Sequence, residues 1–209
     1  HKRPPQDQNA AAITLSRQAR HLLRTAGSAE VSCDQLDVWR GAVAASLYLA
    51  PFQNRLTFAL NGLKDALPRL VHLDGGHWQR DPARHLRALA QMIELRQWLR
   101  DTKTAVPPAL DEVIHRMTPM LRAYRLGDGG LAAFNGGGCG DVALIERVLE
   151  LSGSAAKAVS SAPHTGFHRL TAKHTHVVMD VGAPVHGNAG TLAFEVSAGK
   201  QRLIVNCGG

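Results

Sequence analysis

The sequence predicts an α+β protein in which a helical N-terminal part is followed by an antiparallel β-sheet. Apolar residues recur at helical spacing through the first three quarters of the chain, whereas after about residue 160 they occur in short β-branched segments. Turn residues separate those last segments, as is typical of hairpin-connected strands. We therefore expect a partial helical domain over residues 1–158 and the start of a β-sheet domain over residues 159–209.

The best-defined predicted helix follows Pro107 and Pro108, which suit a helix start. Its apolar stripe consists of Leu110, Val113, Ile114, Met117 and Leu121. Less regular stripes run through residues 13–23, 34–49, 54–71 and 81–99. Asp81 is expected to cap the last of these, and Asp141 a short helix over residues 142–151.

Three segments predict the strands, namely residues 176–182, 191–197 and 202–206. In the second, Leu192, Phe194 and Val196 alternate with more polar neighbours, which indicates one buried and one exposed face. A sheet of about four strands is small and leaves a face and an edge uncovered. We therefore expect the chain to be a fragment of a larger protein.

The net charge is positive, with 24 Lys and Arg against 17 Asp and Glu. Such a charge favours an anionic partner, and nucleic acid, an acidic polysaccharide or an anionic membrane surface would all satisfy it. The sequence contains no helix-turn-helix signature, RNP motif or zinc-finger spacing, so nucleic acid is disfavoured. No apolar run is long enough for a membrane span, and the first residues lack the apolar core of a signal peptide.

The three cysteines, Cys33, Cys139 and Cys207, are far apart and predict neither a zinc knuckle nor a fully paired disulfide framework. His174 and His176 share one strand face at a spacing that zinc would accept, although a solvated face is the simpler interpretation. We expect no cofactor. A structural zinc ion is kept as an alternative, although no clear set of ligands supports it.

Five collinear segments, over residues 73–86, 95–99, 115–136, 161–170 and 190–208, together resemble the heparinase II/III-like family of polysaccharide lyases. They include LDGGHWQRDPARHL and GTLAFEVSAGKQRLIVNCG; before residue 70 only the helix pattern is similar. The resemblance implies an incomplete α/α toroid packed against a β-sandwich, in a bacterial protein of the periplasm or cytoplasm. It further implies an acidic polysaccharide in the cleft between them and β-elimination at a uronic acid.

The resemblance also implies a set of site residues. A base must remove the C5 proton of the uronate, an acid must protonate the departing oxygen, and donors must bind the carboxylate. The implied proton-transfer candidates are His77, His85 and His186. The implied sugar-binding candidates are Trp78, Arg80, Arg84, Asn188 and His164. Trp78 serves equally well as a sugar platform or as a core residue.

Three positions depart from the family pattern. Arg84-His85 stands where the lyases have Tyr-His, and Asn188 stands where they have a histidine. The asparagine that binds the substrate carboxylate has no convincing match in residues 24–35. Either the histidines of this chain supply substitute chemistry, or the protein is a non-catalytic anionic-glycan-binding protein on the same scaffold.

Overall fold

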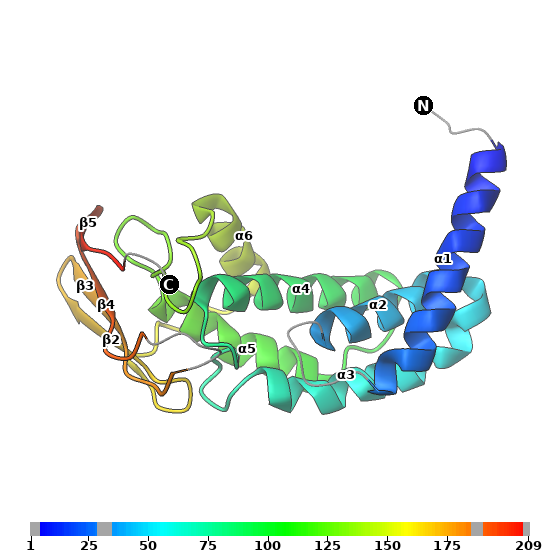
Figure 1. Cartoon of the computed structure of the whole chain (residues 1–209), viewed down its shortest axis with the longest axis horizontal. Helices are drawn as coiled ribbons and strands as arrows, with labels where there is room; N and C mark the ends of the chain where they lie inside the picture. Colours follow the sequence, from blue (N-terminus) through cyan, green and yellow to red (C-terminus); the bar gives the residue numbers. More distant parts are fainter. Residues whose placement is uncertain (1–4, 29–34, 185–189, 207–209) are drawn as a thin grey trace.

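The computed structural model describes residues 5–28, 35–184 and 190–206, and within them the predicted α+β order is confirmed (Figure 1). The helices are α1 Pro5–Thr25, α2 Gln35–Tyr48, α3 Leu56–Leu70, α4 Pro82–Asp101, α5 Pro108–Ala123 and α6 Val142–Ser152. Short 3-10 helices cover Ala26–Ser28 and Ala50–Arg55. The last helix ends at Ser152 and the first strand begins at Ser161, on either side of the boundary expected near residue 158.

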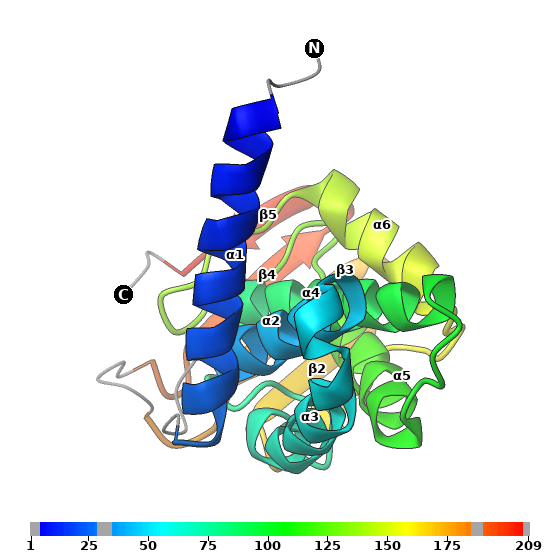
Figure 2. The same cartoon turned by 90° about the vertical axis from the view of Figure 1, so that its right-hand side faces the viewer.

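The helical core is formed by α2 to α5. Helices α2 and α4 lie in one layer and α3 and α5 in the layer below it, while α1 crosses one end and projects away (Figure 2). The stripe predicted on α5 is fully buried, with Leu110, Met117 and Leu121 all inaccessible to solvent. These layers do not by themselves display the α/α toroid that the resemblance implies, and no described helix is long and apolar enough to cross a membrane.

Both predicted aspartate caps are present. The Asp81 carboxylate accepts hydrogen bonds from the backbone N–H groups of Ala83, at 2.7 Å, and Arg84, at 3.2 Å. Asp141 accepts from the N–H of Ala143 at 2.9 Å. A side-chain acceptor at this position satisfies N–H groups that the first helical turn leaves unpaired, so each cap fixes where its helix begins.

The sheet has five antiparallel strands in sequence order. They are β1 Ser161–Ala162, β2 Phe167–Ala172, β3 Thr175–Asp180, β4 Phe194–Ala198 and β5 Gln201–Ile204. The number of strands is one more than predicted, because β1 is only two residues long and pairs with a strand that lacks a clear alternating pattern.

The two faces of the sheet have opposite surroundings. Phe167, Val178 and Asp180 lie on the face that packs against the helices and are buried. On the other face, Leu170, Val177, Val196 and Ile204 lie opposite one another across four strands, and Leu170 and Ile204 are exposed. As predicted, one apolar face is therefore uncovered within the described part of the chain.

Candidate functional site

The segment 72–81, between α3 and α4, is held in place by its own polar side chains. The Asp74 carboxylate accepts hydrogen bonds from the backbone N–H groups of Gly76, at 3.1 Å, and Thr165, at 2.7 Å, and from the Thr165 hydroxyl. Partial burial raises the pKa of Asp74, but the hydrogen bonds from Thr165 and Gly76 outweigh it and lower the pKa below its ordinary value. The turn is thereby attached to the loop that enters the sheet.

Gly75 sits at the tip of the turn with a φ of +87°. A Cβ atom at this position would overlap the backbone carbonyl of Arg116 on α5. Only glycine combines this backbone conformation with such a close approach. The DGG sequence thus reflects the seating of the turn on α5.

Arg80 joins the helical part to the sheet. Its Nε donates to the Thr165 carbonyl at 2.6 Å, and its other guanidinium nitrogens donate to the Ala183 carbonyl and the Asp180 carboxylate. Asn135 donates to the carbonyl of Arg80 at 2.8 Å and to Asp180 at 3.0 Å. Burial raises the pKa of Asp180, against the lowering effect of the N–H of Gly182, of Asn135 and of Arg80.

Arg80 is only 5% exposed, and its guanidinium group is occupied by the protein itself. The expectation that Arg80 is open to an anionic sugar is therefore corrected. Arg80 instead connects the helices to the sheet, a role that suits a guanidinium group because it presents several donors in fixed directions. Sequence reasoning missed its partner Asp180, which is 100 residues away in the chain.

His85 is likewise not open to a sugar. It is completely buried, with Nε2 at 3.0 Å from the Met117 carbonyl and its ring packed edge-on against Tyr124. Burial lowers the pKa of His85 to about 4, despite the opposing effects of the Met117 carbonyl and Asp74. The imidazole is neutral at pH 7, which suits a donor to a carbonyl in the core.

His77 is nearly buried but lines a surface pocket. Burial, reinforced by electrostatic interactions with His85, Arg84 and His72, lowers the pKa of His77 to about 3. The backbone N–H of Gln79 lies 3.4 Å from its Nδ1, so Nδ1 is the acceptor in this contact. His77 therefore presents a neutral imidazole to the pocket.

This pocket, which we call the α2–α4 site, lies between the start of α2 and the first turns of α4. Its lining residues are Leu36, Asp37, His77, Gln79, Arg84, Arg87, Ala88 and Gln91. The cavity measures only about 50 Å³, enough for one or two water molecules, so a sugar would bind across its mouth. Asp37 accepts from Gln91 at 2.5 Å and pairs with Arg87 at 3.4 Å.

Two arginine side chains at the mouth are accessible. Arg84 is 53% exposed and lies 3.4 Å from the Asp81 carboxylate, and Arg87 is 71% exposed. They are three residues apart on one helix, so their side chains are neighbours on the same face. Sequence reasoning selected Arg84 but missed Arg87, Asp37 and Gln91, whose polar spacing is that of an ordinary solvated helix face.

The remaining predicted residues are dispersed. Trp78 is half-buried, packs against the core, and has its ring 6.2 Å from that of His77. His164 is exposed and lines a different pocket, between α3 and α5. His186 and Asn188 fall outside the described residues, so the structure unites only His77 and Arg84 of the expected set at one surface site.

The described residues contain no group of three His, Cys, Asp or Glu side chains placed to hold a metal ion. The ring of His176, one of the two histidines considered for zinc, instead contacts the hydroxyl of Thr171 at 3.3 Å across the β2–β3 hairpin. This contact assigns His176 a partner on the neighbouring strand.

Comparisons with known proteins agree with the fold. Residues 154–209 match the family described as Heparinase II/III-like, C-terminal. The chain is 32% identical over 200 residues to FtsZ-localized protein C of Caulobacter vibrioides, covering 93% of this chain and 34% of that protein.

Solved lyase structures share the fold at low sequence identity. A mutant of the heparan sulfate lyase HepC from Pedobacter heparinus superposes with a TM-score of 0.76 at 16% identity, covering 92% of this chain and 35% of that one. Heparinase III gives a TM-score of 0.75 at 10% identity, covering 94% and 37%. The chain thus spans about a third of the length of the relatives that it matches.

Proposed function

We propose that this chain, whose residues 154–209 match the heparinase II/III-like family and whose fold resembles that of solved heparan sulfate lyases, binds an acidic polysaccharide at the α2–α4 site. The observation that carries the proposal is the pair of accessible guanidinium groups, Arg84 and Arg87, at the mouth of that site. Guanidinium forks match the carboxylates and sulfates of such polymers.

The present partners of these arginines leave them available. Each is paired with an aspartate at 3.4 Å, and the Arg87–Asp37 pair joins two exposed side chains, so it contributes little free energy. Two positive side chains near the N-terminus of α4 are also unfavourable to the helix dipole. A polyanion lying across the mouth would offset this unfavourable interaction.

Binding is favoured over catalysis by the state of the histidines. A general base is most effective when its pKa lies near the working pH, whereas the pKa of His77 is about 3 and that of His85 about 4. His85 also has no accessible surface. Arg84 stands where the family resemblance places the proton-transferring tyrosine, and a guanidinium group stays protonated at neutral pH.

The second candidate function is β-elimination by this site. It is favoured by His77, a neutral imidazole in the wall of the pocket beside Arg84, because the same two groups could accept a proton and bind a uronate carboxylate. In this candidate the C5 proton passes to His77 while Arg84 stabilises the charge on the carboxylate. The C4–O bond then breaks as the C4=C5 double bond forms, and the departing oxygen takes a proton from the His77 imidazolium or from water.

One experiment separates the two candidates. The protein is titrated with heparin, heparan sulfate, hyaluronate, alginate and polygalacturonate, and the ultraviolet absorbance of unsaturated uronate is followed in parallel. We expect saturable binding to at least one polymer without an absorbance rise, weakened about tenfold or more in Arg84→Gln with Arg87→Gln. Arg147→Gln, which removes an exposed ion-paired arginine from α6, serves as the charge control.

Two kinds of result would contradict the binding proposal. The first is an absence of specific binding, seen either as no binding to any polymer or as equal competition by DNA and by heparin, which would indicate charge attraction alone. The second is an absorbance rise that disappears in His77→Ala, which would move the conclusion to the lyase.

The relative in C. vibrioides bears a name that places it with FtsZ. On the strength of 32% identity across most of this chain, we propose that the protein containing this chain shares that location in its own cell. A fluorescent fusion imaged together with labelled FtsZ should show coincident bands. A diffuse signal in cells that have normal FtsZ bands would refute the shared location.

A further inference from the structure

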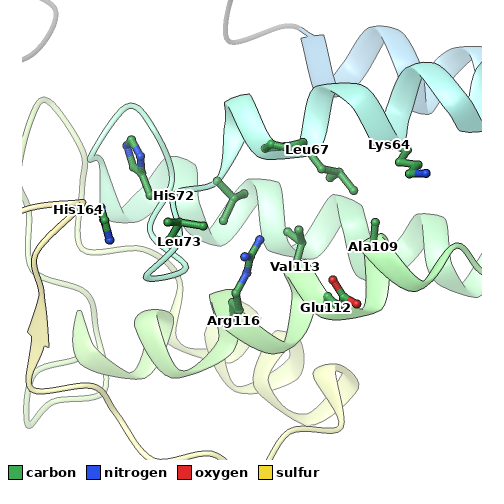
Figure 3. Close-up of a pocket in the computed structure, with 11 residues that line it drawn as sticks. Lys64, Leu67, His72, Leu73, Ala109, Glu112, Val113, Arg116 and His164 are labelled. Atoms are coloured by element: carbon green, nitrogen blue, oxygen red, sulfur yellow. The ribbon is translucent and has the colours of Figure 1, made fainter.

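We propose that the pocket between α3 and α5 is a second, separate binding site, for a small molecule that carries a phosphate or sulfate ester. The pocket has a volume of about 480 Å³, which lies in the range of small-molecule sites. Figure 3 shows its lining side chains, which come from both helices, from the turn after α3 and from the loop before β2. This proposal does not depend on polysaccharide binding at the α2–α4 site.

Basic side chains outnumber acidic ones in the lining of the pocket. Its charged and imidazole groups are Lys64, His72, Arg116 and His164, with Glu112 as the one carboxylate among the lining residues. In Figure 3 the Arg116 side chain rises from α5 beside Val113, whereas His72 and His164 lie on the other side of Leu73, with the His72 ring directed away from Arg116. Lys64 and Glu112 lie toward the other end of the pocket. We therefore expect an oxyanion beside Arg116, with the two histidines toward one end of the pocket and Lys64 toward the other.

The backbone around the histidine end of the pocket is firmly held. The turn residue Gly75 lies against the carbonyl of Arg116, so the turn and α5 meet where Arg116 starts. Asp74 binds both the N–H and the hydroxyl of Thr165, the residue after His164. These contacts fix the turn, α5 and the loop before β2 relative to one another, and such preorganisation of the backbone reduces the entropy lost on binding.

Arg116 also has an unused donor. Its Nε is buried and has no hydrogen-bond acceptor among the residues that the structure describes. A buried donor without an acceptor costs free energy, and more so for a charged group. An oxyanion seated beside Arg116 would supply the acceptor.

The shape and lining define the ligand class. The planar fork of donors on the Arg116 guanidinium suits the several oxygens of a phosphate or sulfate ester. Leu67, Leu73 and Val113 provide an apolar wall for the rest of the molecule. A hexose-sized monoester would fill this space, so we assign a small ester and not inorganic anions alone.

The two sites share no lining residue. His72 and Leu73 face the α3–α5 pocket, whereas His77 and Gln79, a few residues later in the same segment, face the α2–α4 site. Each site can therefore be altered without touching the other, and their failures can be told apart.

The test is a calorimetric and NMR titration of the whole chain with inorganic phosphate, a hexose phosphate, the matching hexose sulfate and the free hexose. We expect one saturable site for at least one ester, tighter than for inorganic phosphate, and no binding of the free hexose. Arg116→Gln should weaken the affinity by about tenfold or more. Arg69→Gln removes the same charge from an exposed position on α3 outside the pocket and should change it less than about twofold.

The preferred ester identifies whether the natural ligand is phosphorylated or sulfated. The proposal is overturned by the absence of saturable binding, by unchanged affinity in Arg116→Gln, or by an equal loss in Arg69→Gln. Circular dichroism checks the fold of each variant. If Arg116→Gln is unfolded, the variant that combines Lys64→Gln with His164→Gln, both at exposed positions, must show the loss instead. Arg84→Gln should leave this titration unchanged, even if polysaccharide binding fails altogether.

Discussion

Arg80→Met is the substitution that tests the junction between the helices and the sheet most directly. The methionine keeps the apolar stem but leaves the Asp180 carboxylate, 1% exposed, without its cation. It also removes the donors to the carbonyls of Thr165 and Ala183. Breaking a buried ion pair from one side costs about 3–5 kcal/mol. Since a domain is stable by only about 5–15 kcal/mol, the loss should be large.

Urea unfolding followed by tryptophan fluorescence measures this loss. The double variant Arg80→Met with Asp180→Leu should recover part of it, because no buried charge is then left unpaired. The pH dependence provides a second readout. In Arg80→Met the pKa of Asp180 is raised further above its unfolded value of about 3.9 by the loss of the cation, so the deficit should shrink as the pH falls and the carboxyl group becomes protonated.

A loss below about 1 kcal/mol in Arg80→Met would refute this reasoning, because exposed ion pairs have contributions of that size. Equal losses in the single and double variants would also contradict it, since they would show that the unpaired carboxylate is not the source of the cost. Arg147→Gln, at an exposed ion pair on α6, is the matched control and should stay within about 0.5 kcal/mol of the parent.

Three further predictions concern single side chains. Because the pKa of His85 falls from 6.5 to about 4 on folding, its contribution to the free energy of unfolding should be complete above pH 6.5 and should decrease by about 3 kcal/mol as the pH falls to about 4. In His85→Leu the urea midpoint should therefore decrease less between pH 6.5 and pH 4 than in the parent. An unchanged decrease would contradict this prediction. Gly75→Ala should destabilise the protein by about 2 kcal/mol more than Gly153→Ala in the same assay, since both have positive φ but only Gly75 faces a backbone carbonyl; equal losses would exclude that contact. Tyr124→Phe should lie within about 1 kcal/mol of the parent in thermal unfolding, because the buried hydroxyl has no acceptor among the described residues, whereas a loss above about 2 kcal/mol would reveal one.

The order of elements was predictable because it depends on local patterns. The apolar spacing on α5 and the two aspartate caps involve residues within a few positions of one another, and each was confirmed. The strand Phe167–Ala172 was not separately predicted, since its buried face carries Phe167 and Arg169 and so lacks the usual apolar alternation. A charged residue on an inward face is explained only by its partners, here the carbonyls of Ala123 and Arg125.

The site was harder to predict because burial and contacts with residues far away in the sequence decide which side chains are open to a ligand. His85 lies four residues before Leu89 and seven before Met92, so the helical period alone could have placed it on the buried stripe of α4. No such signal exists for Arg80, whose partners lie beyond residue 160. His164 lines the same pocket as Arg116 for the same reason, because the turn packs on α5 and the loop is bound to that turn.

These observations give the segment 72–81 one physical explanation. Three of its residues attach it to the rest of the fold. Asp74 binds Thr165, Gly75 packs against α5, and Arg80 pairs with Asp180. The residues left for ligands are those that the attachments leave at the surface, namely His72 on one side of the segment and His77 on the other. A ligand at either pocket therefore acts on the same rigid segment, and a change that loosens its attachments should weaken both sites together.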